Sequence, residues 1–526
     1  MRPMKSTLYF IGIDLGTGTC KSVVVDETGR VQGFGVGEYG LAGAGGRWQE
    51  QDPGGLLTGT VASVCAALGQ AGVAPAHCAG LSVGGALHSV MAVNGRDNPL
   101  TGVITWADGR AVEQARAVAD TPAGKGLYHD TGCPAHGMYP LYKIMWLAAK
   151  RPEVFQAARR YVSAKEYVCF RLTGNWMVDY SLAAGSGLLN THTLRWSEQA
   201  LDLAGIRTDQ LSVLSPPVAP LGRLQATMAA EMGLYADTPV VVGSSDAVNS
   251  SLGAGAVAIP QATLMVGTSG ALRVISPRPV LDPKARSWCY AIDEAHWLVG
   301  GAINNGGVAL SWLRDCLNQA AQGSSAKPMT FEDILALAGR APAGSGGIVC
   351  LPFFAGERSP HWNRNARALF FGMKLEHDMR HLARALLEGV GLRLRSLLEV
   401  LIEVGLDVKQ LVASGGFTQS GLWLQVMADV LDRELSVPVW GETSALAAAF
   451  WAALAAGKAG CMEDIRNWVQ INRVCRPVGS NAAVYGRIYS LYTRLYEAAA
   501  GHFEEVARLQ NELDAIMGER GQDSGP

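Results

Sequence analysis

Two short turns rich in glycine and threonine constrain the fold of this chain more than any other feature. The first, LGTGT at 15–19, joins apolar runs at 8–14 and 20–26. The second, GTSG at 267–270, lies about 250 residues later inside a similar apolar stretch at 262–275. Apolar runs joined by so short a turn are typical of β-hairpins. Two hairpins of one design, each near the start of a half, predict two domains built on one plan, with a boundary near 253–262.

Glycine is also the outlier of the composition. The chain has 63 glycines among 526 residues, whereas an ordinary chain of this length has about 37. There is no Gly-X-Y period, which excludes a collagen-like chain. The surplus of about 26 glycines therefore belongs in turns and in places where backbone segments approach closely.

Charge and apolar runs exclude several classes of protein. Basic and acidic residues number 44 and 46, giving a net charge of −2, so we expect no nucleic-acid partner. The longest apolar run, 445–456, is too short to cross a membrane, which takes about 20 residues. The first apolar run stops at Asp14 and predicts a strand, not a signal peptide. The ten cysteines contain no C-x-x-C pair, which favours reduced thiols and a cytoplasmic protein.

Strands and helices alternate along the chain. Apolar residues recur with helical period at 380–404 and 421–432. The Ala-rich stretch after Thr443 predicts another helix, with Thr443 as its N-cap. Buried-type strands are expected at 238–243 and 410–414. This alternation indicates an α/β fold. From about 483 the chain is expected to be helical and then, from Gly518, polar and frayed.

The first turn has the residues that phosphate chemistry needs. Asp14 ends a strand, and Gly16 and Gly18 let backbone N–H groups approach an anion. A carboxylate at this place suits Mg²⁺ held through water. The turn is not a Walker A loop, because the pattern G-x-x-x-x-G-K-[ST] is absent. It is not a dinucleotide fingerprint either, because Lys21 stands where the third glycine of G-x-G-x-x-G would be. An ordinary tight hairpin remains the alternative.

Two further strand ends carry candidate functional residues. Asp246 follows an apolar strand and opens a helix, so it lies on the usual ligand side of an α/β sheet. It could cap that helix, accept a substrate proton, or do both. Gly415 and Gly416 follow the strand at 410–414, where a flat ligand could lie against the backbone. A plain strand-to-helix turn is the alternative there.

In order, these motifs resemble the FGGY family of carbohydrate kinases. The resemblance covers nearly all of residues 8–457 and rests on GIDLGT at 12–17, GTSG at 267–270, LPFFAGERSPHW at 351–362 and SGG at 414–416. It implies a two-domain actin/hexokinase-like (ribonuclease H-like) ATPase fold of the α/β class, with the active site in the interdomain cleft.

The resemblance also implies domains and partners. It implies an N-terminal domain at 1–256 with the sugar site, the first phosphate loop and the catalytic aspartate. A C-terminal domain at 257–482 would hold the second phosphate loop and the adenosine site, and a helical tail would follow at 483–526. The expected partners are ATP, Mg²⁺ and a small-molecule sugar acid or polyol, with no nucleic acid and no membrane. A homodimer is left open.

Within the family, the segments 132–143, 165–167, 178–181, 267–273 and 300–307 are similar to those of gluconate kinases. This likeness implies ATP-dependent phosphorylation of the terminal hydroxyl of a sugar acid, D-gluconate to 6-phosphogluconate. A xylulose kinase, or another pentulose or polyol kinase, remains the alternative because it shares His88, Trp106 and Asp108. Ala86 stands where xylulose kinases usually carry glutamine, which weakens that alternative.

By position, the family resemblance assigns a role to each matching residue. Asp246 matches the catalytic base, and Asp14 matches the acid associated with Mg²⁺. The implied phosphate and nucleotide contacts are Gly16, Thr17, Gly18, Gly267, Thr268, Gly306, Gly307, Gly415, Gly416 and Ser420. The implied sugar contacts are Leu87, His88, Trp106, Asp108, His136 and Asp246, although His136 could equally be a satisfied polar residue.

Three other features have competing interpretations. Arg110 and Lys165 are candidates to meet a substrate carboxylate, but for each alone a structural ion pair is favoured. His377 and His381 have the i, i+4 spacing of a zinc protease helix, yet the required glutamate is an aspartate. They are expected to line the start of the helix near 380.

Overall fold

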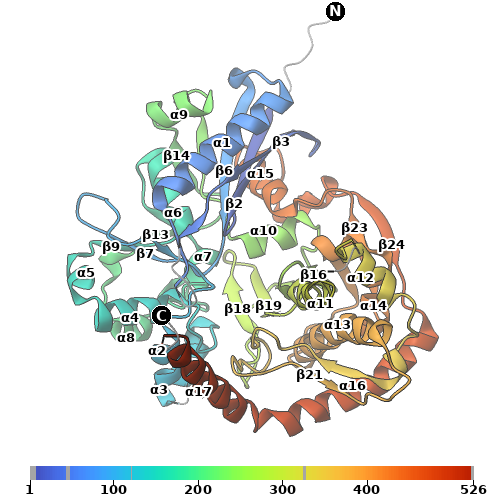
Figure 1. Cartoon of the computed structure of the whole chain (residues 1–526). Helices are drawn as coiled ribbons and strands as arrows, with labels where there is room; N and C mark the ends of the chain where they lie inside the picture. Colours follow the sequence, from blue (N-terminus) through green and yellow to red (C-terminus); the bar gives the residue numbers. More distant parts are fainter. Residues whose placement is uncertain (1–7, 43–47, 120, 324–326, 523–526) are drawn as a thin grey trace, which may run out of the picture. The chain divides into compact units, whose positions relative to one another are not determined.

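The computed structural model of the chain describes residues 8–42, 48–119, 121–323 and 327–522 (Figure 1). It divides into two compact units, each assembled from three stretches of sequence. The first unit contains 1–262, 273–299 and 438–470, and the second contains 263–272, 300–437 and 471–526. Each unit therefore combines segments that lie far apart along the chain.

The first unit is built on a six-stranded sheet. Its strand order is β14 (Pro220–Arg223), β15 (Pro239–Val241), β6 (Cys78–Gly85), β1 (Tyr9–Leu15), β2 (Thr19–Asp26) and β3 (Val31–Glu38). β1 and β2 pair antiparallel, which confirms the first predicted hairpin to within one residue. β6 is parallel to both β1 and β15. The carboxyl ends of these three strands therefore meet at one edge, where ligands of α/β sheets usually bind.

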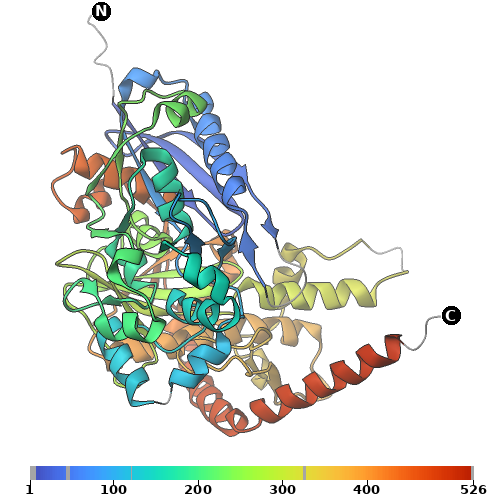
Figure 2. The same cartoon turned by 90° about the vertical axis from the view of Figure 1, so that its left-hand side faces the viewer.

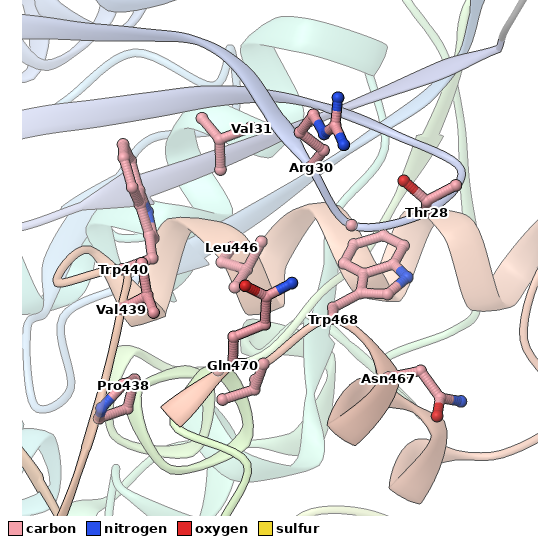
Figure 3. Close-up of a pocket in the computed structure, with 13 residues that line it drawn as sticks. Thr28, Arg30, Val31, Pro438, Val439, Trp440, Leu446, Asn467, Trp468 and Gln470 are labelled. Atoms are coloured by element: carbon pink, nitrogen blue, oxygen red, sulfur yellow. The ribbon is translucent and has the colours of Figure 1, made fainter. Parts of the chain in front are cut away.

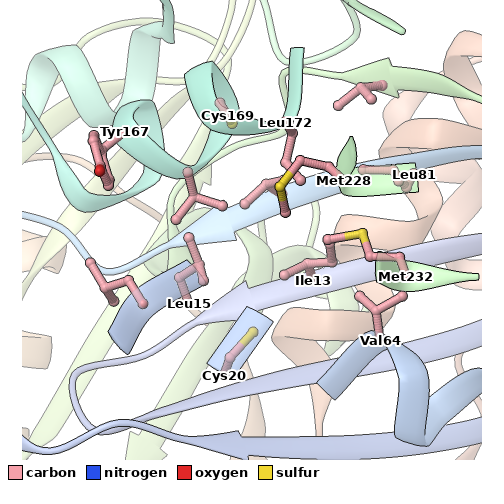
Figure 4. Close-up of a cluster of buried hydrophobic side chains, with 14 of the residues drawn as sticks. Ile13, Leu15, Cys20, Val64, Leu81, Tyr167, Cys169, Leu172, Met228 and Met232 are labelled. Atoms are coloured by element: carbon pink, nitrogen blue, oxygen red, sulfur yellow. The ribbon is translucent and has the colours of Figure 1, made fainter. Parts of the chain in front are cut away.

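Helices cover both faces of this sheet. On one face, Ile11 and Ile13 of β1 pack with α1 (Pro53–Ala71), α6 (Ala164–Thr173) and α9 (Ala226–Met232) (Figure 4). On the other face, Phe10 packs against α15 (Thr443–Ala455). The alternation of neighbouring β1 residues between the two faces follows the pleat of a strand. The first unit is thus a three-layer αβα structure.

Glycines on β3 explain part of the glycine surplus. A Cβ added at Gly33, Gly35 or Gly37 would come within about 2 Å of a backbone oxygen of α1. These positions therefore need glycine so that the helix can lie directly on the strand. By length and composition α1 could cross a membrane, but it packs here as a core helix against β2 and β3.

The second sheet has seven strands, most of whose residues belong to the second unit. Its order is β18 (Trp288–Ala291), β19 (Trp297–Ile303), β17 (Gly270–Ser276), β16 (Gln261–Val266), β22 (Gln410–Ser414), β23 (Glu434–Pro438) and β24 (Ile471–Cys475). β16 and β17 are neighbours, which confirms the second predicted hairpin. The helices α11 (Gly307–Ala320), α13 (Met379–Glu403) and α14 (Gly421–Leu431) accompany this sheet, and α13 packs against both others.

Two details of the predicted helices were wrong. Thr443 is the first residue of α15 rather than its N-cap, which is Glu442. The chain ends in α16 (Gly479–Ala500) and α17 (Phe503–Gln522), so the helix continues past Gly518, where fraying was expected. Both helices are visible as the long red elements of Figure 2. The predicted polar end beyond Gln522 and the first seven residues lie outside the described residues.

The remaining elements are short or lie at the periphery of the sheets. The strands are β4 (Leu41–Ala42), β5 (Glu50–Gln51), β7 (Met91–Val93), β8 (Val103–Ile104), β9 (Arg160–Val162), β10 (Met177–Asp179), β11 (Leu189–Asn190), β12 (Arg195–Trp196), β13 (Val213–Ser215), β20 (Val349–Leu351) and β21 (Leu369–Phe371). The helices are α2 (Val112–Ala119), α3 (Pro122–Thr131), α4 (Pro140–Lys150), α5 (Pro152–Ala157), α7 (Tyr180–Ala184), α8 (Glu198–Ala204), α10 (Asp246–Gly253) and α12 (Phe331–Ala338).

Candidate active site

Two carboxylates lie near the carboxyl edge of the first sheet. Asp14 is the penultimate residue of β1, and Asp246 is the first residue of α10. The N-cap of α10 is Ser245, whose side chain accepts from the Val248 N–H, so the N-cap interpretation of Asp246 is wrong. Asp246 Oδ1 instead accepts from the backbone N–H groups of Leu87 at 3.2 Å and Ala247 at 2.8 Å.

Burial raises the pKa of both acids. Burial and the negative charge of Asp246 raise the pKa of Asp14 to about 7, and Lys21 opposes the shift. Burial also raises the pKa of Asp246, while the charge of Arg273 and the two N–H donors lower it. Asp14 Oδ1 is buried with no hydrogen-bond partner. Two adjacent acids with an unsatisfied oxygen favour a nearby cation.

The first phosphate turn is braced by side chains. The Tyr39 hydroxyl donates to the carbonyls of Gly16 at 2.8 Å and Thr19 at 3.0 Å. Gln51 Nε2 donates to the carbonyl of Thr17 at 2.7 Å. A Cβ added at Gly18 would meet nothing within 4 Å. The turn is therefore fixed from one side and open at Gly18, as an anion site requires.

The predicted sugar contacts Leu87, His88 and Trp106 lie on loops that hydrogen-bond to Asp246 or to the first phosphate turn. Leu87 donates its N–H to Asp246, as described above. His88 has a φ of 68°, and its Nδ1 lies 2.6 Å from the Gly185 carbonyl oxygen. Trp106 Nε1 donates to Thr17 Oγ1 at 3.0 Å. The structure thus links Leu87 directly to Asp246 and Trp106 directly to the first phosphate turn.

Asp108 joins its own loop to the segment that contains Gln49. Its carboxylate accepts from the Gln49 N–H at 2.7 Å and from the Arg110 side chain at 2.7 and 2.8 Å. Arg110 also pairs with Glu50 and lies over the ring of Trp48. These contacts give the buried side chains of Asp108 and Arg110 a structural use.

The other candidate residues for a substrate carboxylate also have partners. Lys165 forms a buried ion pair with Asp179 at 2.5 Å. The favoured interpretation of Arg110 and Lys165 as structural ion pairs is therefore confirmed.

His136 Nδ1 accepts from the Met138 N–H at 3.2 Å, while the ring remains partly exposed. Among the proposed sugar contacts, His136 thus has an internal contact but stays accessible.

The second unit holds a cavity of about 530 Å³ beside the second phosphate turn. Five predicted nucleotide contacts line it: Gly267, Thr268, Gly307, Gly416 and Ser420. Gly306 lies behind this wall, because its N–H donates to the Thr268 carbonyl at 3.1 Å. Gly415 has a φ of 94°, and a Cβ there would meet the Val266 oxygen at 2.5 Å. The structure thus brings the predicted nucleotide residues of this unit together.

The segment 351–362 supports this cavity from behind. Glu357 Oε1 accepts from the Asn304 N–H at 2.7 Å, and its carboxylate lies 3.4 Å from Arg393. Asn305 exchanges hydrogen bonds with the backbone of Ala355 and Gly356 at 2.9 and 2.8 Å. These buried bonds fix the loop directly before Gly306 and Gly307.

Sequence reasoning missed several residues of these sites. Phe331, Leu335 and Trp423 form apolar walls of the nucleotide cavity, but they are far apart in the sequence and carry no local signal. Arg273 acts on the charge of Asp246, and its Nη1 donates to Ser250 Oγ at 2.9 Å. Its signal was the likeness of the segment 267–273 to gluconate kinases, which gave Arg273 itself no role.

Two other sequence features lie elsewhere. His377 and His381 flank Asp378, the N-cap of α13, which confirms that they line the start of that helix. Among the described residues there is no cluster of three metal-ligating side chains. A second cavity of about 530 Å³, in the first unit, is walled by Trp440, Trp468 and Leu446 (Figure 3). No predicted site residue lines it.

Comparison with known proteins defines the family. Residues 9–253 match the N-terminal domain of the FGGY family of carbohydrate kinases, and residues 262–456 match its C-terminal domain. The chain therefore belongs to the FGGY family of carbohydrate kinases. It is an enzyme of the kinase class with the two-domain actin/hexokinase-like fold.

Individual relatives narrow the comparison. A gluconokinase from Bacillus licheniformis is 36% identical over 97% of this chain and 99% of its own length. A xylulose kinase from Escherichia coli is 28% identical over 93% of this chain and 98% of its own length. The structure of gluconate kinase from Lactobacillus acidophilus matches with a TM-score of 0.90 and 32% identity, covering 95% of this chain and all of that one. The ligand-bound xylulose kinase from the same organism matches with a TM-score of 0.89 and 32% identity, covering 95% and 99%.

Proposed function

We propose that this chain phosphorylates the terminal hydroxyl of D-gluconate, using ATP, to give 6-phosphogluconate. The observation that carries the choice of substrate is the 36% identity to a gluconokinase along almost the whole chain. The curated xylulose kinases share only 25–28%. The geometry supports the reaction class, because an acid near a strand end lies beside the proposed sugar contacts.

Asp246 is the proposed catalytic base. Its carboxylate is held by two backbone N–H groups and is partly exposed, so one side can face a substrate hydroxyl. The raised pKa brings its basicity closer to that needed to accept a proton near neutral pH. As the hydroxyl oxygen attacks the γ-phosphorus, its proton passes to Asp246 while the bond to the β-phosphate oxygen breaks.

The family implies Mg²⁺, and the residues present fit it. Asp14 has a buried oxygen without a hydrogen-bond partner and a carboxyl group of raised pKa, and a bound cation would satisfy both. Asp14 would hold the ion. When bound, Mg²⁺ supplies charge neutralisation for the phosphates.

ATP is proposed to use backbone groups more than charged side chains. Gly16, Thr17 and Gly18 would contact phosphate in the first unit, and Gly267 and Thr268 in the second. Gly306, Gly307, Gly415, Gly416 and Ser420 would hold the nucleotide. The cavity of the second unit supports this assignment, because its apolar walls suit an adenine ring.

In this proposal the N-terminal domain, 1–256, binds the sugar and supplies the base. The C-terminal domain, 257–482, binds the nucleotide, and the helical tail follows at 483–526. We also propose a cytoplasmic location, since all ten cysteines are unpaired thiols and ATP is a cytoplasmic substrate. A homodimer remains an open part of the proposal.

A xylulose kinase is the second candidate. The match to the Lactobacillus xylulose kinase, at the same 32% identity as the gluconate kinase structure, favours it. An assay of ADP release separates the two candidates, run on the purified chain with D-gluconate, D-xylulose, D-ribulose and glycerol. We expect the highest kcat/KM with D-gluconate. Turnover of a ketose without turnover of any sugar acid would reject the gluconate assignment.

A further inference from the structure

Lys143, on α4, is a lysine in an unusual position. Its side chain is completely buried. Its Nζ donates to the carbonyl oxygens of His88 at 2.6 Å and Thr105 at 2.7 Å. The carboxylate of Asp108 acts on this ammonium group through its charge and is itself paired with Arg110. Burying a cation is costly unless its N–H groups find partners, so these two hydrogen bonds tie Lys143 to both carbonyls.

Those carbonyls belong to the two loops that carry most of the proposed sugar contacts. One loop follows β6 and contains Leu87 and His88. The other follows β8 and contains Trp106 and Asp108. The Thr105 carbonyl also accepts from the Asp108 N–H at 3.2 Å, so the ammonium group acts on the start of that turn. A single buried group therefore joins both loops to α4.

The first of these loops needs such support. His88 has a φ of 68°, a left-handed conformation that costs free energy in a residue with a side chain. Its ring is fixed by the Gly185 carbonyl and lies edge-on to Tyr139 and Tyr290, 5.0 and 5.9 Å away between ring centroids. Its carbonyl is fixed by Lys143. The preceding residue donates its N–H to Asp246, so the same turn also determines how Asp246 is held.

We propose that Lys143 is a positioning residue of the sugar site. Its ammonium group holds the turn at His88 against the turn at Thr105, and so fixes both the sugar-contacting residues and the hydrogen bond from Leu87 to Asp246. The inference rests on the proposed function. Lys143 is too deeply buried to touch the sugar itself, so it acts through the two loops.

The charge of this group should respond to pH. Burial lowers the pKa of Lys143 to about 7, the charge of Asp108 raises it, and that of Arg110 lowers it. Both charged groups that act on it, Asp108 and Arg110, come from the loop after β8. Above pH 7 the amine loses its charge and one N–H, so its hydrogen bonds to the two carbonyls weaken. The KM for the sugar is then expected to rise between pH 7 and pH 8.5.

The test compares Lys143→Met and Lys143→Arg with Lys150→Met, an exposed lysine on the same helix. Steady-state kinetics are measured from pH 6 to 9 with the sugar that the wild type turns over fastest. For Lys143→Met we expect kcat/KM for the sugar to fall roughly 10- to 100-fold, with the KM for ATP unchanged. Lys143→Arg keeps its charge at all these pH values and should lose the alkaline rise in sugar KM. Lys150→Met should behave as wild type.

Two further measurements separate positioning from stability alone. Thermal melting reports how far each variant is destabilised. Crystal structures of the wild type and Lys143→Met report the distance from Leu87 N to Asp246 Oδ1, now 3.2 Å, which should lengthen in the variant. A folded Lys143→Met protein with sugar kinetics within twofold of Lys150→Met overturns the inference. If Lys143→Met does not fold, an unchanged alkaline rise in Lys143→Arg overturns it instead.

Failure of the proposed function would look different. A wild type that does not phosphorylate D-gluconate rejects that substrate, whereas the comparison of variants can still be made with another sugar and in the crystal structures.

Discussion

The two glycine-threonine turns have similar sequences but are supported in different ways. The first, at 15–19, follows an acid and is braced by the side chains of Tyr39 and Gln51. The second, at 267–270, is braced by main chain: the N–H of Gly307 donates to Gly267 at 2.7 Å and that of Val308 to Thr268 at 3.1 Å. Met265 holds the place in the second hairpin that Asp14 holds in the first.

This difference teaches how one hairpin plan serves two tasks. Around the first turn, side chains connect a carboxylate and a phosphate loop to the proposed sugar contacts. Around the second turn, backbone bonds join the loop to the start of α11, beside the nucleotide cavity. We therefore expect substitutions in the first unit to affect chemistry and sugar binding, and those in the second to affect ATP binding.

The largest effect is expected at Asp246. In Asp246→Asn the base is lost while the side chain can still meet the N–H of Leu87. The value of kcat should fall by roughly 10²- to 10⁴-fold, with little change in the KM for ATP. Glu198→Gln, at the first position of α8, is the matched control and should retain full activity. Retention of wild-type kcat by Asp246→Asn would refute its role as the base.

Asp14→Asn should reduce activity and raise stability together. The folded protein holds a proton on Asp14 up to about pH 7, whereas the unfolded chain releases it near pH 3.8. The folded state thus binds more protons between these values, and stability falls as pH rises through them. Asparagine removes that loss, so the free energy of unfolding at pH 8 should rise by about 1–2 kcal/mol.

Urea denaturation at pH 8 and pH 4 measures this effect. The gain should be present at pH 8 and nearly absent at pH 4, where Asp14 is protonated in the folded wild type. Equal stability of the two proteins at pH 8 would mean that the pKa of Asp14 is not raised in the folded protein.

Gly416→Ala tests the nucleotide half. A Cβ at this position meets no protein atom within 4 Å, although the residue lines the cavity. The added methyl group should therefore leave the fold intact and raise the KM for ATP by about 5- to 10-fold, which corresponds to about 1 kcal/mol. Gly479→Ala, equally open but outside the cavity, is the control. An unchanged KM for ATP would place the nucleotide elsewhere.

The smallest effect is expected for Thr17→Val, which removes the hydrogen bond from Trp106 Nε1. The loss of about 1 kcal/mol should raise the KM for the sugar by a few-fold. Thr58→Val, on the exposed surface of α1, controls for the change of side chain. A change confined to the KM for ATP would instead mean that Thr17 serves only the phosphates.

Local patterns were enough to predict the hairpins, the main helices and both acids. Each depends on a few adjacent residues, such as the apolar runs around 15–19 or the strand before Asp246. The sequence also predicted that Arg110 and Lys165 were more suited to internal ion pairs than to a substrate carboxylate.

Other features depend on contacts between distant segments. The glycines of β3 face the backbone of α1, and Phe331 and Trp423 share only the lining of the cavity. The N-cap of α10 was misassigned by one residue, because Ser245 and Asp246 can both cap a helix and only the folded backbone decides between them. Lys143 gave no signal as a buried cation, since its two partners are carbonyls, which any residue has.

The most direct test of the account is to identify the product. The purified chain is incubated with ATP, Mg²⁺ and D-gluconate labelled with ¹³C at C6, and the products are followed by ³¹P and ¹³C NMR. We predict one new phosphomonoester signal, with coupling between phosphorus and the labelled C6. Absence of a phosphorylated gluconate, or phosphate on any other carbon, would contradict the account.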